Sequence, residues 1–124
     1  MRRVQIAGLH HVAINVSDVD EAIGFYRDVL GFSIIESRPD FGFPGAWLQA
    51  GANQVHLILA TEGFVPDRAQ HYALQVDDAD AWAHHLDELG VQHRRSPYRA
   101  GAGQQIVVKD PTGNRIELNQ TDQA

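Results

Sequence analysis

The sequence predicts an α+β fold in which two βαβββ modules follow one another and form cupped, mixed sheets. Three observations support this prediction. A pattern of one histidine, two aspartates and a glycine begins at His11 and begins again at His71. In each copy, a segment of alternating apolar and polar residues precedes a segment with apolar residues at helical spacing. The copies also end alike, since "ANQVHLIL" and "TGNRIELN" align with His56 over Glu117. Such repetition indicates two copies of one structural unit.

Length and composition favour a single globular domain spanning residues 1–124, with modules at about 8–60 and 70–120. The 124 residues are 44% hydrophobic, which is enough to bury a core. The net charge of −6 is spread along the chain and argues against nucleic-acid binding. The apolar runs are far shorter than the roughly 20 residues that cross a bilayer, so no membrane association is expected. The lack of cysteine excludes disulfides and agrees with a cytoplasmic location, which we expect.

The first module is expected to contain one helix between its first two strands. Ser17 is the predicted N-cap, acidic residues follow in the first turn, and Gly31 ends the helix. The apolar stripe of this helix is Val19, Ala22, Phe25 or Tyr26, and Val29. The strands are expected near residues 8–16, 32–38, 45–50 and 54–60.

The second module repeats this order after a linker over Thr61 to Gln70, "TEGFVPDRAQ". Asp77 is the predicted N-cap of its helix and Gly90 the residue that ends it. The apolar stripe is Trp82, Leu86 and Leu89. The strands are expected near residues 70–76, 91–96, 104–109 and 115–120, and "DPTGN" (Asp110 to Asn114) is the expected hairpin connection between the last two.

The two-residue period of a strand assigns side chains to faces of each sheet. Val12, Ile14 and Val16 share one face of the first strand, and the corresponding apolar faces of the other strands should pack under the helices. The opposite faces are more polar, and we interpret them as a concave cup. One residue with metal-binding chemistry lies on that face in each of four strands: His11, His56, His71 and Glu117.

Three imidazoles and a carboxylate that converge would bind a divalent cation. This ligand set suits zinc, iron(II), nickel, cobalt or manganese better than calcium or magnesium. A lone strand histidine is more often a hydrogen-bonded structural residue, but four residues at matched repeat positions and on one face favour a metal. The other histidines keep the structural interpretation: His10, His84, His85 and His93.

Several amides share the cup face and are candidates for binding polar atoms of a small-molecule substrate. The alternative is that they form cross-strand hydrogen bonds. They are Asn15, Gln49, Gln75, Gln105 and Asn119.

The stretches "HHVAINVSDVDEAIGFYRDVLGF" and "VKDPTGNRIEL" resemble the opening and closing signatures of the vicinal oxygen chelate superfamily. This group includes glyoxalase I, bleomycin-resistance proteins and extradiol dioxygenases. The resemblance implies a glyoxalase-like fold, a homodimer and a metal in each cup. Carried over by position, the ligands are His11, His56, His71 and Glu117. It also implies that His11 of one chain can work with His71 and Glu117 of a second chain.

The resemblance leaves two functional hypotheses open. The first is a divalent-metal enzyme, either a glyoxalase-like lyase or isomerase or a ring-cleaving dioxygenase, with Glu117 as the catalytic base. Its substrate would chelate the metal through adjacent oxygens. The alternative is a non-catalytic protein that sequesters a small molecule or antibiotic, although bleomycin-sequestering members lack the ligands. No subfamily fits fully, because glyoxalase I enzymes usually have glutamate where this chain has His56, whereas extradiol and fosfomycin-resistance enzymes use two histidines and a glutamate.

Overall fold

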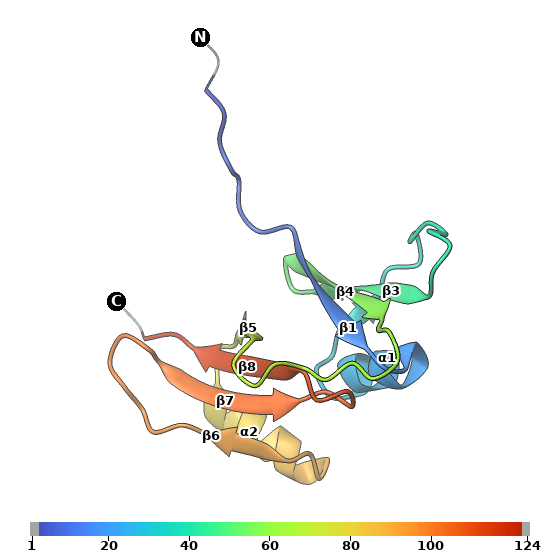
Figure 1. Ribbon diagram of the computed structural model, residues 1–124. Coiled ribbons are helices and arrows are strands. Elements are labelled where there is room, and N and C mark those ends of the chain that lie inside the picture. The colour runs from blue at the N-terminus through green and yellow to red at the C-terminus, as the bar shows by residue number, and fades with distance from the viewer. Residues whose placement is uncertain (1–2, 123–124) are drawn as a thin grey trace.

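The computed structural model describes residues 3–122 and contains two sheets, each covered by one helix (Figure 1). The first module consists of β1 (His11–Val16), α1 (Val19–Asp28), β2 (Ser33–Ile34), β3 (Gly45–Ala50) and β4 (Asn53–Leu59). The second consists of β5 (His71–Gln75), α2 (Ala79–Glu88), β6 (His93–Arg95), β7 (Gln104–Lys109) and β8 (Arg115–Gln120).

The two sheets have the same topology, which confirms the predicted tandem βαβββ fold. Their strand orders are β1-β4-β3-β2 and β5-β8-β7-β6. In each sheet the first and last strands of the module pair in parallel, and the remaining neighbours are antiparallel. The equivalent register pairs are Ala13 with His56 and Ala73 with Glu117. This equivalence confirms the alignment of His56 with Glu117 in the sequence repeat.

Three strands are shorter by three residues or more than the sequence suggested, and β5 (expected at 70–76) is shorter by one residue at each end. β1 begins at His11 rather than near residue 8, because the exposed segment before Leu9 extends away from both sheets (Figure 1). Leu9 and His10 bond to β4 through their carbonyl oxygens, which accept from Asn53 Nδ2 and Gln54 N. β2 covers two residues of the expected 32–38, since the chain turns away from β3 after the bond from Ile35 N to Trp47 O. β6 covers three residues of the expected 91–96.

Both helices begin one residue later than predicted. Asp18, rather than Ser17, accepts a hydrogen bond from Glu21 N at 2.9 Å, and Asp78, rather than Asp77, accepts one from Ala81 N at 3.0 Å. An N-cap side chain must reach the amide three residues on, and these aspartates are in that position. Ser17 instead contacts Thr112, because Ser17 N donates a hydrogen bond to the Thr112 hydroxyl at 2.9 Å.

The core lies between each sheet and its helix, on the faces assigned by the two-residue period. Val16, Leu57, Ile116 and Leu118 are at most 1% exposed, whereas His11 and His71 on the other faces are exposed. The apolar faces therefore pack under the helices as predicted, and the polar faces remain available for a site.

The β7–β8 connection joins the two modules, in addition to forming the predicted hairpin. Asp110 is 4% exposed and accepts a hydrogen bond from Tyr26 Oη of α1 at 2.8 Å. Burial, together with the neighbouring Tyr72 and Asp110, raises the pKa of Tyr26, which therefore stays protonated and donates. Asn114 Nδ2 donates to both Asp110 Oδ2 and Asn15 O. These bonds hold the hairpin of the second module against the first.

The segment that precedes β1 exposes apolar side chains. Val4, Ile6 and Leu9 are 90%, 92% and 80% exposed. Among the described residues, no helix has the length and apolar character needed to cross a membrane.

Candidate functional site

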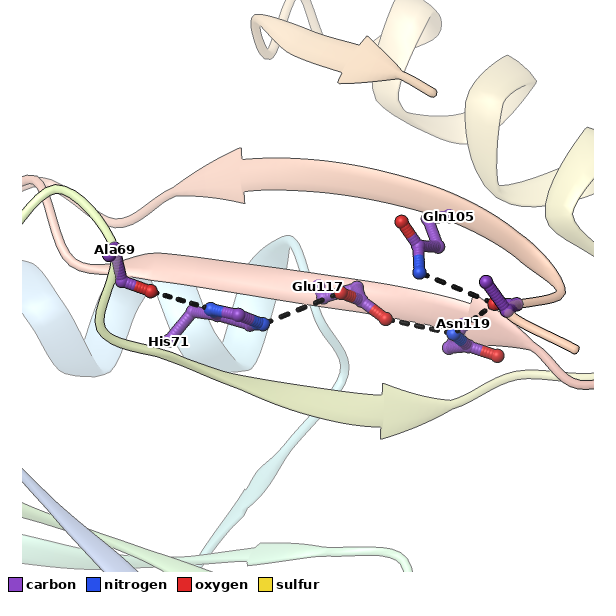
Figure 2. A network of polar contacts seen from close by, with 6 residues as sticks. Ala69, His71, Gln105, Glu117 and Asn119 are labelled. Atoms are coloured by element: carbon purple, nitrogen blue, oxygen red, sulfur yellow. Dashed lines mark hydrogen bonds and ion pairs between the residues drawn. The ribbon is translucent and has the colours of Figure 1, made fainter. Parts of the chain in front are cut away.

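The clearest ligand pair is His71 on β5 and Glu117 on β8. These strands are parallel neighbours, and Glu117 pairs in register with Ala73, two residues beyond His71. Both side chains therefore lie on the same face of the sheet. His71 Nε2 and Glu117 Oε1 are 3.5 Å apart (Figure 2).

Each member of this pair also forms a hydrogen bond within the chain, through the side-chain atom that points away from the other member. His71 Nδ1 lies 2.8 Å from Ala69 O, and because a carbonyl oxygen only accepts, Nδ1 carries the proton. In the neutral ring Nε2 is therefore the nitrogen with the lone pair, and it faces Glu117. Glu117 Oε2 accepts from Asn119 Nδ2 at 2.8 Å, which leaves Oε1 directed at the histidine (Figure 2). Such outer hydrogen bonds orient the ligands of metal sites.

The separation of the pair fits two ligands of one metal ion. A distance of 3.5 Å is beyond the usual hydrogen-bond range. Two ligands that are each about 2.1 Å from a tetrahedral ion lie roughly 3.4 Å apart. A neutral imidazole nitrogen and a carboxylate oxygen also match the ligand preferences of zinc and related metals. The residues of this pair thus fit a borderline divalent cation.

The other predicted ligands, His11 and His56, form a second pair on the first sheet. Their rings stack with centroids 3.9 Å apart, and the other face of the His56 ring stacks on Trp47 at 4.6 Å. His56 is 9% exposed, so this ring is enclosed between its two neighbours. His10, for which the sequence predicted only a structural role, also contacts this pair. Its Nδ1 lies 2.8 Å from Nδ1 of His11.

The polar environment of His56 favours the neutral ring. Its Nε2 lies 2.8 Å from Gln54 Oε1, so Nε2 donates and Nδ1 keeps its lone pair. Burial, followed by the nearby His11, His10 and Arg38, lowers the pKa of His56 below its usual value. A neutral imidazole is the form that binds metal, but binding through Nε2 would require His56 to release Gln54.

One chain brings the four predicted ligands together as two pairs rather than as one cluster. His11 and His56 belong to the first sheet, and His71 and Glu117 to the second. Within residues 3–122 no three histidine or acidic side chains gather closely enough to hold a metal.

The predicted amides mostly bond to the chain itself. Gln49 Nε2 donates to Gly51 O and Asn53 O, and Gln75 Oε1 accepts from Thr121. Gln105 Nε2 donates to Ala102 O at 3.3 Å (Figure 2). Asn119 orients Glu117. Asn15 contributes its backbone carbonyl to Asn114.

The sequence interpretation overlooked several residues beside these pairs. Trp47 was not assigned, although the same two-residue period places it opposite His56 on the cup face. A cleft of about 1190 Å³ over the second sheet includes His71 and Glu117 and is also lined by Arg94, Lys109 and Arg115. The period of β7 and β8 would have placed Lys109 and Arg115 on this face.

Two tandem βαβββ modules, with histidine and glutamate on their concave faces, define a protein of the paired-module, glyoxalase-like class. Comparison with known proteins gives the family. Residues 8–118 match the Glyoxalase/Bleomycin resistance protein/Dioxygenase superfamily, and the chain belongs to that superfamily.

Relatives within this superfamily carry different names. The chain is 29% identical to Glyoxylase I 4 of Arabidopsis thaliana over 128 residues, covering 96% of this chain and 74% of the relative. A Bacillus anthracis protein assigned to the glyoxalase family has a TM-score of 0.86 and 26% identity, covering 98% of this chain and 100% of the other. TnmS3, an antibiotic-binding protein from a Streptomyces species, has a TM-score of 0.78 and 25% identity, covering 97% and 100%.

Proposed function

We propose that this protein is a divalent-metal-dependent enzyme whose small substrate chelates the metal through adjacent oxygens. The observation that carries the proposal is the His71–Glu117 pair. The 3.5 Å separation of the pair matches that of two ligands of one ion. Its outer hydrogen bonds, from His71 to Ala69 O and from Asn119 to Glu117, are of the kind that orients metal ligands. Membership of a superfamily that includes glyoxalases and dioxygenases agrees with this assignment.

We further propose that the complete site forms between two copies of the chain. Two ligands alone do not complete the shell of a borderline metal, and a single chain separates the two pairs. In a twofold dimer, His11 and His56 of one protomer would face His71 and Glu117 of the other, and two equivalent sites would result. The exposed Val4, Ile6 and Leu9 supply apolar surface that a second copy would cover.

The roles of the side chains follow from their environment. When bound, the metal would act as a Lewis acid that stabilises an oxyanion on the substrate. Because Ala69 O accepts a hydrogen bond from Nδ1, the lone pair of the neutral His71 ring lies on Nε2, the atom that would bind the metal. Glu117 Oε1 is directed into the site while Asn119 restrains Oε2, so Glu117 would act as a general base for a substrate proton when Oε1 is free of the metal. The ring of Trp47 forms an apolar wall beside His56.

Mixing two inactive variants tests the shared site. His11→Ala and His71→Ala are purified separately, mixed under conditions that allow subunit exchange, and analysed for bound zinc or manganese. Each variant alone should bind little metal. After random exchange, half of the dimers are mixed and each contains one intact site, so about a quarter of the wild-type metal should return. Light scattering should give twice the 13.7 kDa of one chain. No recovery, or a monomeric mass, would contradict the intersubunit site.

A second candidate function is the sequestration of a small molecule without chemistry. The stacked Trp47, His56 and His11 rings favour it, since they form a column of aromatic rings on the cup face beside which an aromatic compound could pack. The likeness to an antibiotic-binding protein agrees with this alternative. A protein that purifies without stoichiometric metal and binds aromatic compounds unchanged by His71→Ala would support sequestration over catalysis.

A further inference from the structure

The cleft over the second sheet is cationic in a protein that is acidic as a whole. The chain has a net charge of −6 and ten lysine and arginine residues. Four of these line the cleft that holds His71 and Glu117, and Asp87 and Glu117 are the acidic residues of its lining. The basic residues are Arg68, Arg94, Lys109 and Arg115.

Two of these cations are direct neighbours. Lys109 on β7 and Arg115 on β8 are partners in the strand register. Their side chains share the cup face, because Arg115 and Glu117 are two residues apart on one strand. Like charges directly opposite on adjacent strands destabilise a sheet. The arrangement therefore costs folding free energy that the fold itself does not require.

These cations form no close ion pair with a carboxylate of the described residues, although Asp67 lies near enough to Arg115 to interact with it electrostatically. Within residues 3–122, Arg68, Arg94, Lys109 and Arg115 form no ion pair, whereas Arg27 pairs with Asp28 and Arg95 with Asp80. The guanidinium of Arg115 is positioned by a hydrogen bond to the backbone carbonyl of Arg68. Arg94 on β6 is the register partner of Val107 on β7, and Val107 is the register partner of Glu117 on β8. Arg94 therefore lies on the same face of the sheet as Glu117.

We propose that Lys109, Arg115 and Arg94 bind an anionic group of the substrate, either a carboxylate or a phosphoryl group. This assignment of the substrate class rests on the proposed metal-dependent function. Arg115 is the register partner of His71 and lies two residues from Glu117 on β8, so these cations flank the proposed metal ligands. The substrate is therefore a small organic anion whose charged group lies beside the oxygens that would meet the metal. Binding of the anion relieves the repulsion between Lys109 and Arg115.

The test uses the metal-free protein, so that it does not depend on the metal site. Isotope-labelled protein is titrated with inorganic phosphate in one series and with acetate in another, at constant ionic strength, and amide shifts are followed by NMR. The variants are Lys109→Gln and Arg115→Gln. Arg95→Gln is the matched control, because Arg95 follows Arg94 directly but pairs with Asp80. Thermal unfolding is recorded for the wild type and Lys109→Gln.

The wild type should show saturable shifts around residues 107–117. The dissociation constant should rise about tenfold or more in Lys109→Gln and Arg115→Gln, since each loses a charge-assisted hydrogen bond. Arg95→Gln should bind as the wild type does. Without added anion, Lys109→Gln should melt at a higher temperature than the wild type, which a purely structural lysine would not do. Tighter binding of phosphate identifies a phosphoryl group, and tighter binding of acetate identifies a carboxylate.

Two results would overturn the proposal: no saturable binding of either anion, or an equal loss of binding in Arg95→Gln. The outcome is separable from that of the metal test. If His71→Ala abolishes metal binding but leaves the phosphate or acetate titration intact, both proposals stand. If the protein binds the anion and never binds metal, the anion site stands and the metal-dependent function fails.

Discussion

His71 and Glu117 face each other across two parallel strands, with Nε2 and Oε1 3.5 Å apart and with Ala69 and Asn119 holding their other atoms. His71→Ala and Glu117→Ala should each reduce metal affinity by about 100-fold or more, because removal of even an outer-shell partner costs roughly 10- to 100-fold. Metal analysis and competition with a chelator measure this loss.

The fold of these two variants should remain largely intact. Both side chains lie on the cup face, away from the helix-packed core, so little apolar area is lost. Circular dichroism and thermal unfolding provide the control. Variants that are unfolded when purified would show that the pair is structural.

The sequence predicted the fold well because the repeat and the two-residue period are local signals. They were sufficient to assign Val16 and Leu57 to the core and His11 and His71 to the opposite face. Local signals could not distinguish Ser17 from Asp18 as the N-cap, because both are good capping residues and one position separates them.

The candidate site was harder to predict because it depends on the distance between the two sheets. The two-residue period of the strands correctly assigned His56 and Glu117 to the cup face. No local pattern in the sequence, however, could predict that a single chain keeps these two residues on separate sheets. The role of Asp110 was missed for the same reason, since its partner Tyr26 lies in the other module.

His56→Gln should weaken metal affinity less than His71→Ala does. An imidazole nitrogen is a better donor to borderline ions than an amide oxygen, but three other ligands would remain and water could complete the shell. Equilibrium dialysis of both variants with zinc compares the two effects. An unchanged affinity in His56→Gln would make the ring stacked between His11 and Trp47 a packing residue. Strong glyoxalase activity of the protein would also argue against His56 as a metal ligand, because His56 stands where glyoxalase I enzymes usually have a glutamate.

The lowered pKa of His56 predicts a pH dependence of stability in the metal-free protein. Its pKa in the folded state is below the ordinary value of 6.5, so just below that pH the unfolded chain binds the proton and the folded chain does not. The free energy of unfolding should therefore fall as pH decreases through 6.5 and level off below the folded pKa. Urea unfolding of the wild type and His56→Gln at several pH values isolates this contribution. A difference that stays constant with pH would contradict it.

Asp110 should be the most sensitive polar position outside the site. It accepts hydrogen bonds from Tyr26 Oη, from the amides of Thr112, Gly113 and Asn114, and from Asn114 Nδ2. Asp110→Ala leaves these donors without their acceptor and should cost about 3 kcal/mol or more, whereas Tyr26→Phe should cost about 1 kcal/mol.

Asp28→Ala is the matched control for Asp110→Ala. Asp28 is exposed and pairs with its neighbour Arg27, so its loss should change stability by less than about 0.5 kcal/mol. All variants should be unfolded at one protein concentration, because the stability of the proposed dimer would depend on concentration. Equal losses for Asp28→Ala and Asp110→Ala would show that the hairpin does not join the modules energetically.

Two glycines of the first module should respond to alanine in opposite directions. A Cβ at Gly45 on β3 would collide with the backbone oxygen of Leu57, which cannot move without disturbing the β3–β4 pairing. Gly45→Ala should therefore cost roughly 1–3 kcal/mol through overpacking. A Cβ at Gly24, inside α1, meets no atom within 4 Å. Gly24→Ala should stabilise the protein by about 0.5–1 kcal/mol, because alanine is the better helix former. Denaturant unfolding of both variants gives the sign directly, and a stabilising Gly45→Ala would show that β3 and β4 are less closely packed than described.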